Sequence, residues 1–160
     1  MLNNLCDLYL PEPVRTKKLA ILNYYDKNFI FDTNKLYNGY MNVSINRLAI
    51  VYMVSSLRKE DIISYGVPLK YKDVRITREE AFIIATNYIN NEFSDGKNRF
   101  LELDYKYGIP LVWHFSIFEE DPDPDIAGWG SVKIDKLDGH IWSEYEYYEY
   151  LYDYNNILTW

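Results

Sequence analysis

The most constraining feature of the sequence is a helix signal at residues 77–93, followed by segments in which apolar and polar residues alternate. Thr77 and Glu80 have capping-box spacing, in which each side chain can bond to the other residue's backbone amide. Apolar residues then recur at helical spacing until Asp95-Gly96 supplies a stop. The pattern predicts one amphipathic helix whose core face holds Phe82, Ala85, Ile89 and Phe93, with Ala81 and Tyr88 widening the stripe.

Four strands are expected after this helix, because each of the following segments has period-two alternation. Their inner faces are expected to hold Leu101, Leu103, Tyr105, Leu111, Trp113, Phe115, Ile117, Val132, Ile134 and Ile141. The apolar stripe of the helix and these faces can enclose one core. The expected fold class is α+β, with one amphipathic helix packed on a four-stranded antiparallel sheet.

The amino-terminal half gives weaker signals. Residues 1–72 are expected to form a mixed α/β amino-terminal elaboration, and residues 73–160 the helix-plus-sheet unit with its acidic, tyrosine-rich tail. Residues 19–25 and 29–31 are candidate strands, and Asn38-Gly39 is typical of a hairpin turn. Residues 44–57 fit a helix or a strand. Gly66-Val67-Pro68 ends the preceding segment, and residues 68–75 mark the expected boundary between the halves.

Cysteine content and apolar run length restrict the class of protein. Cys6 is the only cysteine, which excludes an internal disulfide and a zinc site made of several thiolates. The first ten residues lack the pattern of a secretory signal, and the longest apolar run, residues 48–54, is too short to span a bilayer. The sequence therefore predicts a cytoplasmic protein that does not associate with membranes.

Charge is distributed unevenly along the chain. The net charge is −7, but residues 119–160 hold eleven acidic and two basic residues, whereas residues 1–118 hold thirteen acidic and fifteen basic residues. An acidic surface repels phosphate backbones and attracts basic proteins. We therefore expect a basic protein partner and no nucleic acid.

The carboxy-terminal half resembles PepSY-like units, which combine a helix with an antiparallel sheet. The resemblance is carried by Glu79-Glu80-Ala81, by Trp113-His114-Phe115 and by residues 131–141, Ser-Val-Lys-Ile-Asp-Lys-Leu-Asp-Gly-His-Ile. It covers about 65 residues. Similar units occur among immunity proteins of bacterial toxin systems, and the resemblance implies a structural role for Asp135, Asp138 and Gly139 in the final turn.

No residue pattern indicates catalysis, a metal or a cofactor. Asp121 to Asp125 alternate acids with prolines, but a calcium loop starting at Asp121 would need glycine at 126 and glutamate at 132, where the chain has Ile126 and Val132. His114 and His140 are expected on the outer sheet face with Ser116, Glu102, Asp104, Ser131, Lys133 and Trp142, without a spacing that enforces ligation. No catalytic, metal or cofactor residue is therefore predicted.

The tail from Glu144 to Tyr154 is dense in tyrosines and acids. A strand would place Tyr148, Tyr150, Tyr152 and Tyr154 on one side, and a helix would group Tyr145, Tyr148 and Tyr152. Tyrosine suits both a packing layer against the amino-terminal half and a protein interface. The predicted partner-binding residues are Glu119, Glu120, Asp121, Asp123, Asp125, Trp129, Trp142, Tyr148, Tyr150 and Tyr152.

These residues favour a non-enzymatic binding protein, namely a cytoplasmic immunity or inhibitor protein that neutralises a basic toxin enzyme. Two other hypotheses stay open. One is a small metal-dependent or carboxylate-dependent enzyme that uses the outer sheet face, and the other is a regulatory module that senses a ligand.

Overall fold

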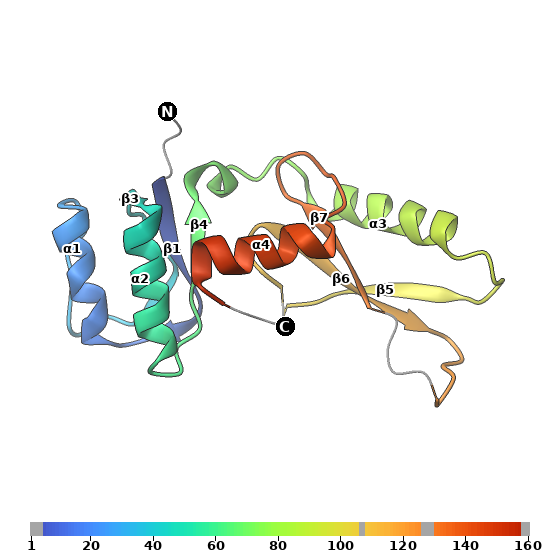
Figure 1. Cartoon of the computed structure of the whole chain (residues 1–160), viewed down its shortest axis with the longest axis horizontal. Helices are drawn as coiled ribbons and strands as arrows, with labels where there is room; N and C mark the ends of the chain where they lie inside the picture. Colours follow the sequence, from blue (N-terminus) through green and yellow to red (C-terminus); the bar gives the residue numbers. More distant parts are fainter. Residues whose placement is uncertain (1–4, 106–107, 126–129, 158–160) are drawn as a thin grey trace. The chain divides into compact units, whose positions relative to one another are not determined.

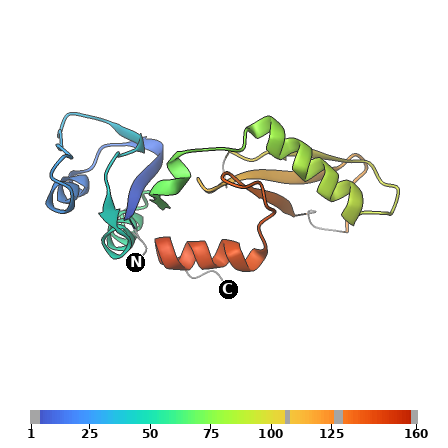
Figure 2. The same ribbon diagram turned by 90° about the horizontal axis from the view of Figure 1, so that it is seen from above.

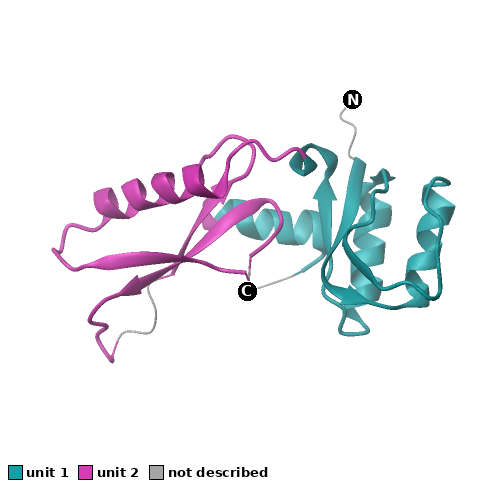
Figure 3. Cartoon of the chain, turned by 180° about the vertical axis from the view of Figure 1, so that it is seen from behind, with its two compact units in different colours: residues 1–72, 145–160 teal, residues 73–144 magenta. Residues whose placement is uncertain are grey.

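The computed structural model describes residues 5–105, 108–125 and 130–157. The chain is α+β and divides into two compact units (Figure 3). Unit 1 comprises residues 1–72 and 145–160, and unit 2 comprises residues 73–144. The division after Lys72 coincides with the expected boundary, but the tail from Tyr145 belongs to unit 1 instead of the helix-plus-sheet unit. Within the described residues, no helix is long and apolar enough to cross a membrane.

The sheet of unit 1 is organised around β1 (Leu5–Val14). This strand pairs antiparallel with β2 (Tyr37–Tyr40), β3 (Ile45–Asn46) and β4 (Tyr65–Pro68) (Figure 1). Cys6, Leu8 and Leu10 alternate along β1 and are fully buried in the core of the unit. Asp7, between them, is also fully buried, and its carboxylate accepts bonds from the amides of Leu8, Asn42 and Val43 and from the Lys72 ammonium.

Helical segments occupy positions that the sequence left open or assigned to strands. Residues 19–25 lie in the 3-10 helix η1 (Lys17–Ile21) and helix α1 (Leu22–Tyr25), because Leu19 and Leu22, three positions apart, both enter the core. The other candidate strand, residues 29–31, is irregular. Residues 44–57 overlap α2 (Arg47–Arg58), whose N-cap, Asn46, accepts bonds from the backbone amides of Leu48 and Ala49. A second 3-10 helix, η2 (Leu69–Lys72), follows β4 (Tyr65–Pro68) directly.

The Asn38-Gly39 pair does not form a hairpin turn. Both residues lie within β2, where Gly39 pairs with Leu10 and has a φ of +77°. The predicted hairpin turn is therefore wrong, and the left-handed Gly39 lies instead at an irregularity in a strand pair.

The tyrosine-rich tail forms a helix, α4 (Glu144–Asn155). Tyr150, Leu151 and Asn155 are its buried residues. The Tyr150 hydroxyl donates to the Gly66 carbonyl at 2.8 Å, and the Gly66 amide donates to Asn155 Oδ1 at 2.9 Å. These contacts tie α4 to β4 inside unit 1, as expected from the packing interpretation of the tail.

Unit 2 contains α3 (Arg78–Glu92) and the sheet β5 (Arg99–Leu103), β6 (Val112–Glu119) and β7 (Ser131–Asp135), in the order β5-β6-β7. Both bonds of the predicted capping box are present. Among the described residues the sheet is antiparallel and has three strands, because Ile141 makes an isolated bridge to Ile134 before α4 begins at Glu144. The prediction of a four-stranded sheet is therefore not confirmed.

The core of unit 2 lies between α3 and one face of this sheet (Figure 2). Ala81, Ala85 and Ile89 pack there with Phe115, Ile117, Val132 and Ile134. Phe82 is not on this core face and is 44% exposed. Small alanines allow the helix to approach the sheet closely, so the alanine-lined face is buried and the bulkier Phe82 lies at its margin.

Candidate protein-binding surfaces

The predicted acidic cluster is only partly available at the surface. Glu119 is buried, and its carboxylate accepts a 3.0 Å bond from the Arg99 guanidinium and lies 3.8 Å from Lys97. Arg99 also donates to both carboxylate oxygens of Asp95 and holds the pKa of that carboxyl well below its ordinary value. Glu119 is therefore a structural ion-pair residue, and its prediction as an exposed steering charge is wrong.

The other acids of this segment are exposed. Glu120 accepts a bond from the Asn98 amide group at 2.9 Å, which closes the end of the β5-β6 pair. Asp121, Asp123 and Asp125 are also at the surface, and Asp123 accepts a bond from the backbone amide of Asp125. We call the exposed set Glu120, Asp121, Asp123 and Asp125 the acidic loop.

Of the two predicted tryptophan anchors, the structure describes one. Trp129 lies outside the described residues. Trp142 is half-buried, and its indole N–H donates to Asp135 Oδ2 at 2.8 Å while its ring stacks on His140. Since the Trp142 side chain is used within the hairpin of unit 2, the structure does not offer it as an exposed anchor.

Exposed tyrosines gather on one face of α4. Tyr145, Tyr148 and Tyr152 are 75%, 46% and 55% exposed. They lie three and four residues apart, which places them on one side of a helix together with the exposed Glu149. We call this set the α4 tyrosine face. Tyr150, also predicted to bind a partner, points the other way and is buried, and burial raises its pKa well above the ordinary value.

The predicted outer face of the unit 2 sheet is a network of polar side chains. Ser116 Oγ donates to Asp104 Oδ2 at 3.2 Å, and the Lys133 ammonium bonds to Ser131 Oγ and Glu144. His114, on the same face, is buried. These groups are largely engaged with one another, which indicates a structural layer in unit 2.

One group of potential metal ligands occurs among the described residues, and it does not include His114. Asp135, Asp138 and His140 each place one ligand atom within 4.8 Å of the others. Asp135 Oδ1 accepts from the amides of Leu137 and Asp138, and Asp138 Oδ1 accepts from the His140 amide. The turn thus accounts for this arrangement of carboxylates, with Gly139 at a φ of +77°.

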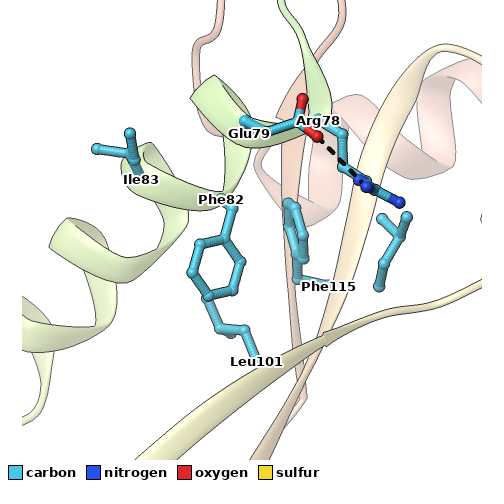
Figure 4. Close-up of a pocket in the computed structure, with 7 residues that line it drawn as sticks. Arg78, Glu79, Phe82, Ile83, Leu101 and Phe115 are labelled. Atoms are coloured by element: carbon cyan, nitrogen blue, oxygen red, sulfur yellow. Dashed lines mark hydrogen bonds and ion pairs between the residues drawn. The ribbon is translucent and has the colours of Figure 1, made fainter.

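An open apolar groove runs between α3 and β5 within unit 2 (Figure 4). Its volume is about 430 Å³. Phe82 points from the helix toward Leu101 of β5, and the Phe82 and Phe115 ring centroids lie 5.9 Å apart in an edge-to-face arrangement. We call the set Arg78, Glu79, Phe82, Ile83, Leu101, Leu103 and Phe115 the α3-β5 groove. The sequence did not indicate this groove, because its pattern placed Phe82 in the core.

Comparisons of this chain with protein-family models, with curated proteins and with solved structures found no match.

Proposed function

We propose that this chain is a non-enzymatic protein-binding protein, a cytoplasmic immunity or inhibitor protein that neutralises a basic toxin enzyme by covering it. The observation that carries the proposal is the α4 tyrosine face, where three exposed rings and Glu149 share one side of a helix. Tyrosine combines a large apolar ring with a hydroxyl, and its few rotatable bonds lower the entropy cost of docking.

The charge of the chain supports a basic partner. Four side chains of the acidic loop are exposed in unit 2, and α4 adds Glu144, Glu146, Glu149 and Asp153. Acidic groups on a protein surface raise the encounter rate with a basic protein and add less to the final affinity. Buried aromatic anchors then slow dissociation. The two kinds of residue therefore have separable roles in the proposed complex.

The order of elements in unit 2 supports the PepSY-like part of the proposal. A capped helix, α3, precedes three antiparallel strands, and Asp135, Asp138 and Gly139 shape the turn after the last of them. This is the order of elements that the resemblance implies. It agrees with the structural role that the resemblance implies for Asp135, Asp138 and Gly139.

The test is recovery of the partner from the source cell, with the full chain as bait. We expect a basic enzyme to be retained by the wild-type chain and lost when Tyr148 and Tyr152 are both changed to alanine. Tyr24→Ala is the matched control, because Tyr24 is also an exposed tyrosine of unit 1, at 72%, but lies off the α4 tyrosine face. Adding the purified chain should then inhibit the recovered enzyme.

Two results would contradict the proposal. One is recovery of an acidic protein whose retention is equal for the wild-type chain, the Tyr148→Ala, Tyr152→Ala variant and the control. The other is a retained basic enzyme whose activity the purified chain leaves unchanged, since the chain would then bind without neutralising.

A further inference from the structure

The α3-β5 groove is apolar and leaves large side chains in contact with solvent. Phe82 and Ile83 are 44% and 59% exposed, and both face the groove from α3. On the opposite wall, Leu101 and Leu103 of β5 line the same space. A surface of this kind gains free energy when a partner's apolar side chains cover it.

The wall made by β5 is the edge of a sheet. The strand order places β5 beside β6 alone, and in the part of the chain that the structure describes no strand pairs with its other side. The Asp104 amide donates to the His114 carbonyl at 2.7 Å, and the Glu120 amide donates to the Asn98 carbonyl at 3.1 Å. Even-numbered residues of this segment therefore bond to β6.

Alternation along an antiparallel strand then fixes the direction of the odd-numbered residues. The N–H and C=O groups of Leu101 and Leu103 point away from β6, toward the outer side of the edge. The side chains of the same two residues line the groove. Leu101 and Leu103 thus present a row of backbone donors and acceptors directly beside an apolar groove.

We propose that an extended segment of a partner protein adds to β5 as a further strand and places alternate apolar side chains in the α3-β5 groove. A strand satisfies both features at once, because its backbone pairs with the edge and every second side chain projects to the groove side. A helix would fill the groove and leave the edge groups of Leu101 and Leu103 unpaired.

Charge at one end of the groove specifies the partner segment further. The Arg78 side chain is 54% exposed, and its guanidinium donates two 3.3 Å bonds, to Glu79 and to the Tyr105 hydroxyl. A guanidinium has five N–H donors, and an exposed ion pair between neighbours contributes little stability. Arg78 can therefore donate to a carboxylate on the incoming strand, so the segment carries an acidic residue beyond its apolar positions.

This inference does not rest on the α4 tyrosine face, and its test keeps the two apart. A displayed library of random peptides of about nine residues, longer than a usual strand, is selected on the purified full chain. We expect enriched peptides to have apolar residues at alternate positions and a nearby acid. A labelled enriched peptide should bind the wild-type chain and the Tyr148→Ala, Tyr152→Ala variant equally.

Three substitutions locate the binding site. Ile83→Asp places a charge in the groove and should weaken peptide binding about tenfold or more. Leu101→Pro removes an N–H that points away from β6 and keeps every bond to β6. It should also weaken peptide binding about tenfold or more. The matched control is Phe100→Asp, because Phe100 lies on the same strand, is 46% exposed and faces the opposite side of the sheet. The control should bind as the wild type does.

Amide hydrogen exchange distinguishes strand addition from simple filling of the groove, and it needs no variant. Saturating peptide should slow exchange of the Leu101 and Leu103 amides about tenfold or more, while the Phe100 amide, already paired with β6, should change little. The inference is overturned if no peptide is enriched, if the enriched peptides have helical spacing, or if these amides keep their exchange rates. A concentration-dependent dimer that Leu101→Pro abolishes would assign the edge to a second copy.

Discussion

At the scale of single residues, Gly66 and Asn155 explain why the tail packs in unit 1. Both polar groups of the Gly66 backbone are used by α4, since its amide donates to Asn155 and its carbonyl accepts from Tyr150. A Cβ at position 66 would lie 2.5 Å from Ile50 and 2.8 Å from the Tyr154 carbonyl oxygen, so a larger residue does not fit without movement. These bonds join positions 89 and 84 residues apart in the sequence.

The first prediction concerns the Tyr150 hydroxyl. Tyr150→Phe leaves the buried Gly66 carbonyl without this donor and should lower the free energy of unfolding of unit 1 by about 1 to 3 kcal/mol. The measurement is the labelling rate of the Cys6 thiol at increasing urea, because Cys6 is fully buried in unit 1. Tyr152→Phe, on an exposed ring, should change stability by less than about 0.5 kcal/mol. Equal effects of the two variants would contradict the assignment.

The second prediction is a loss of stability at alkaline pH. Burial raises the pKa of Cys6 from 9.0 to about 11 and that of Tyr40 from 10.0 to about 12. Because these folded-state values exceed the unfolded ones, the stability that the neutral groups contribute is fully present below about pH 9 and is lost as pH rises through 11 and 12.

The urea midpoint, measured at intervals across this alkaline range, should therefore fall as pH rises. Cys6→Ala removes the thiol and should flatten the part of the curve between its unfolded and folded pKa values. A midpoint that stays constant across the range would show that neither group is protected in the folded state.

At the scale of elements, local signals predicted unit 2 well. The capping box at Thr77 and Glu80 fixed the start of α3, and alternation located β5, β6 and β7. Ala85 and Ile89 are buried as expected, but Phe82 was placed in the core incorrectly, because apolar residues surround much of this helix. Which of its stripes is buried depends on how closely the sheet approaches, and spacing alone does not report that distance.

Unit 1 was harder to predict because its elements depend on pairing between distant residues. Pro11 and Pro13 argue against a strand, yet both lie in β1 beyond Leu10, where the strand pairs only with β2. A strand paired on one side tolerates proline where an N–H is not needed. The tail likewise has a tyrosine pattern compatible with a strand or a helix. The structure shows a helix, and this helix makes the contacts with β4.

The third prediction tests the cap of α3. Thr77→Ala removes the hydroxyl that accepts from the Glu80 amide at 3.1 Å and should cost about 1 kcal/mol of unit 2 stability. Hydrogen exchange of the Ile89 amide at increasing urea reports the unfolding of unit 2, because Ile89 is buried in the core of this unit. Thr86→Ala is the matched control within the same helix, and its effect should be smaller. The reverse order of the two costs would contradict the capping assignment.

At the scale of the whole molecule, surface exposure was predicted better for the acidic and tyrosine-rich segments as a whole than for their individual residues. The acidic and tyrosine-rich segments do present exposed carboxylates and rings, but individual members of each set are buried. Glu119 pairs with Arg99, and Tyr150 bonds to Gly66, and in both cases the burying partner is distant in sequence. Net charge and composition could not separate these residues from their exposed neighbours.

The proposed division of labour predicts distinct kinetics for two variants. In the first variant, Glu120 is changed to glutamine, and the other acidic-loop residues are changed to asparagine, namely Asp121, Asp123 and Asp125. Glu119 is kept because it forms the buried ion pair with Arg99. This variant tests electrostatic steering. The second variant, Tyr148→Ala with Tyr152→Ala, tests the α4 tyrosine face as the anchor.

The most direct measurement of the central claim is the rate of association and dissociation of the recovered partner with these two variants at several salt concentrations. Neutralising the acidic loop should lower the association rate and flatten its dependence on salt. Truncating the α4 tyrosine face should raise the dissociation rate and cost about 2 kcal/mol or more of binding free energy. If both variants bind with wild-type rates at every salt concentration, the exposed acids and tyrosines do not form the interface and the account is contradicted.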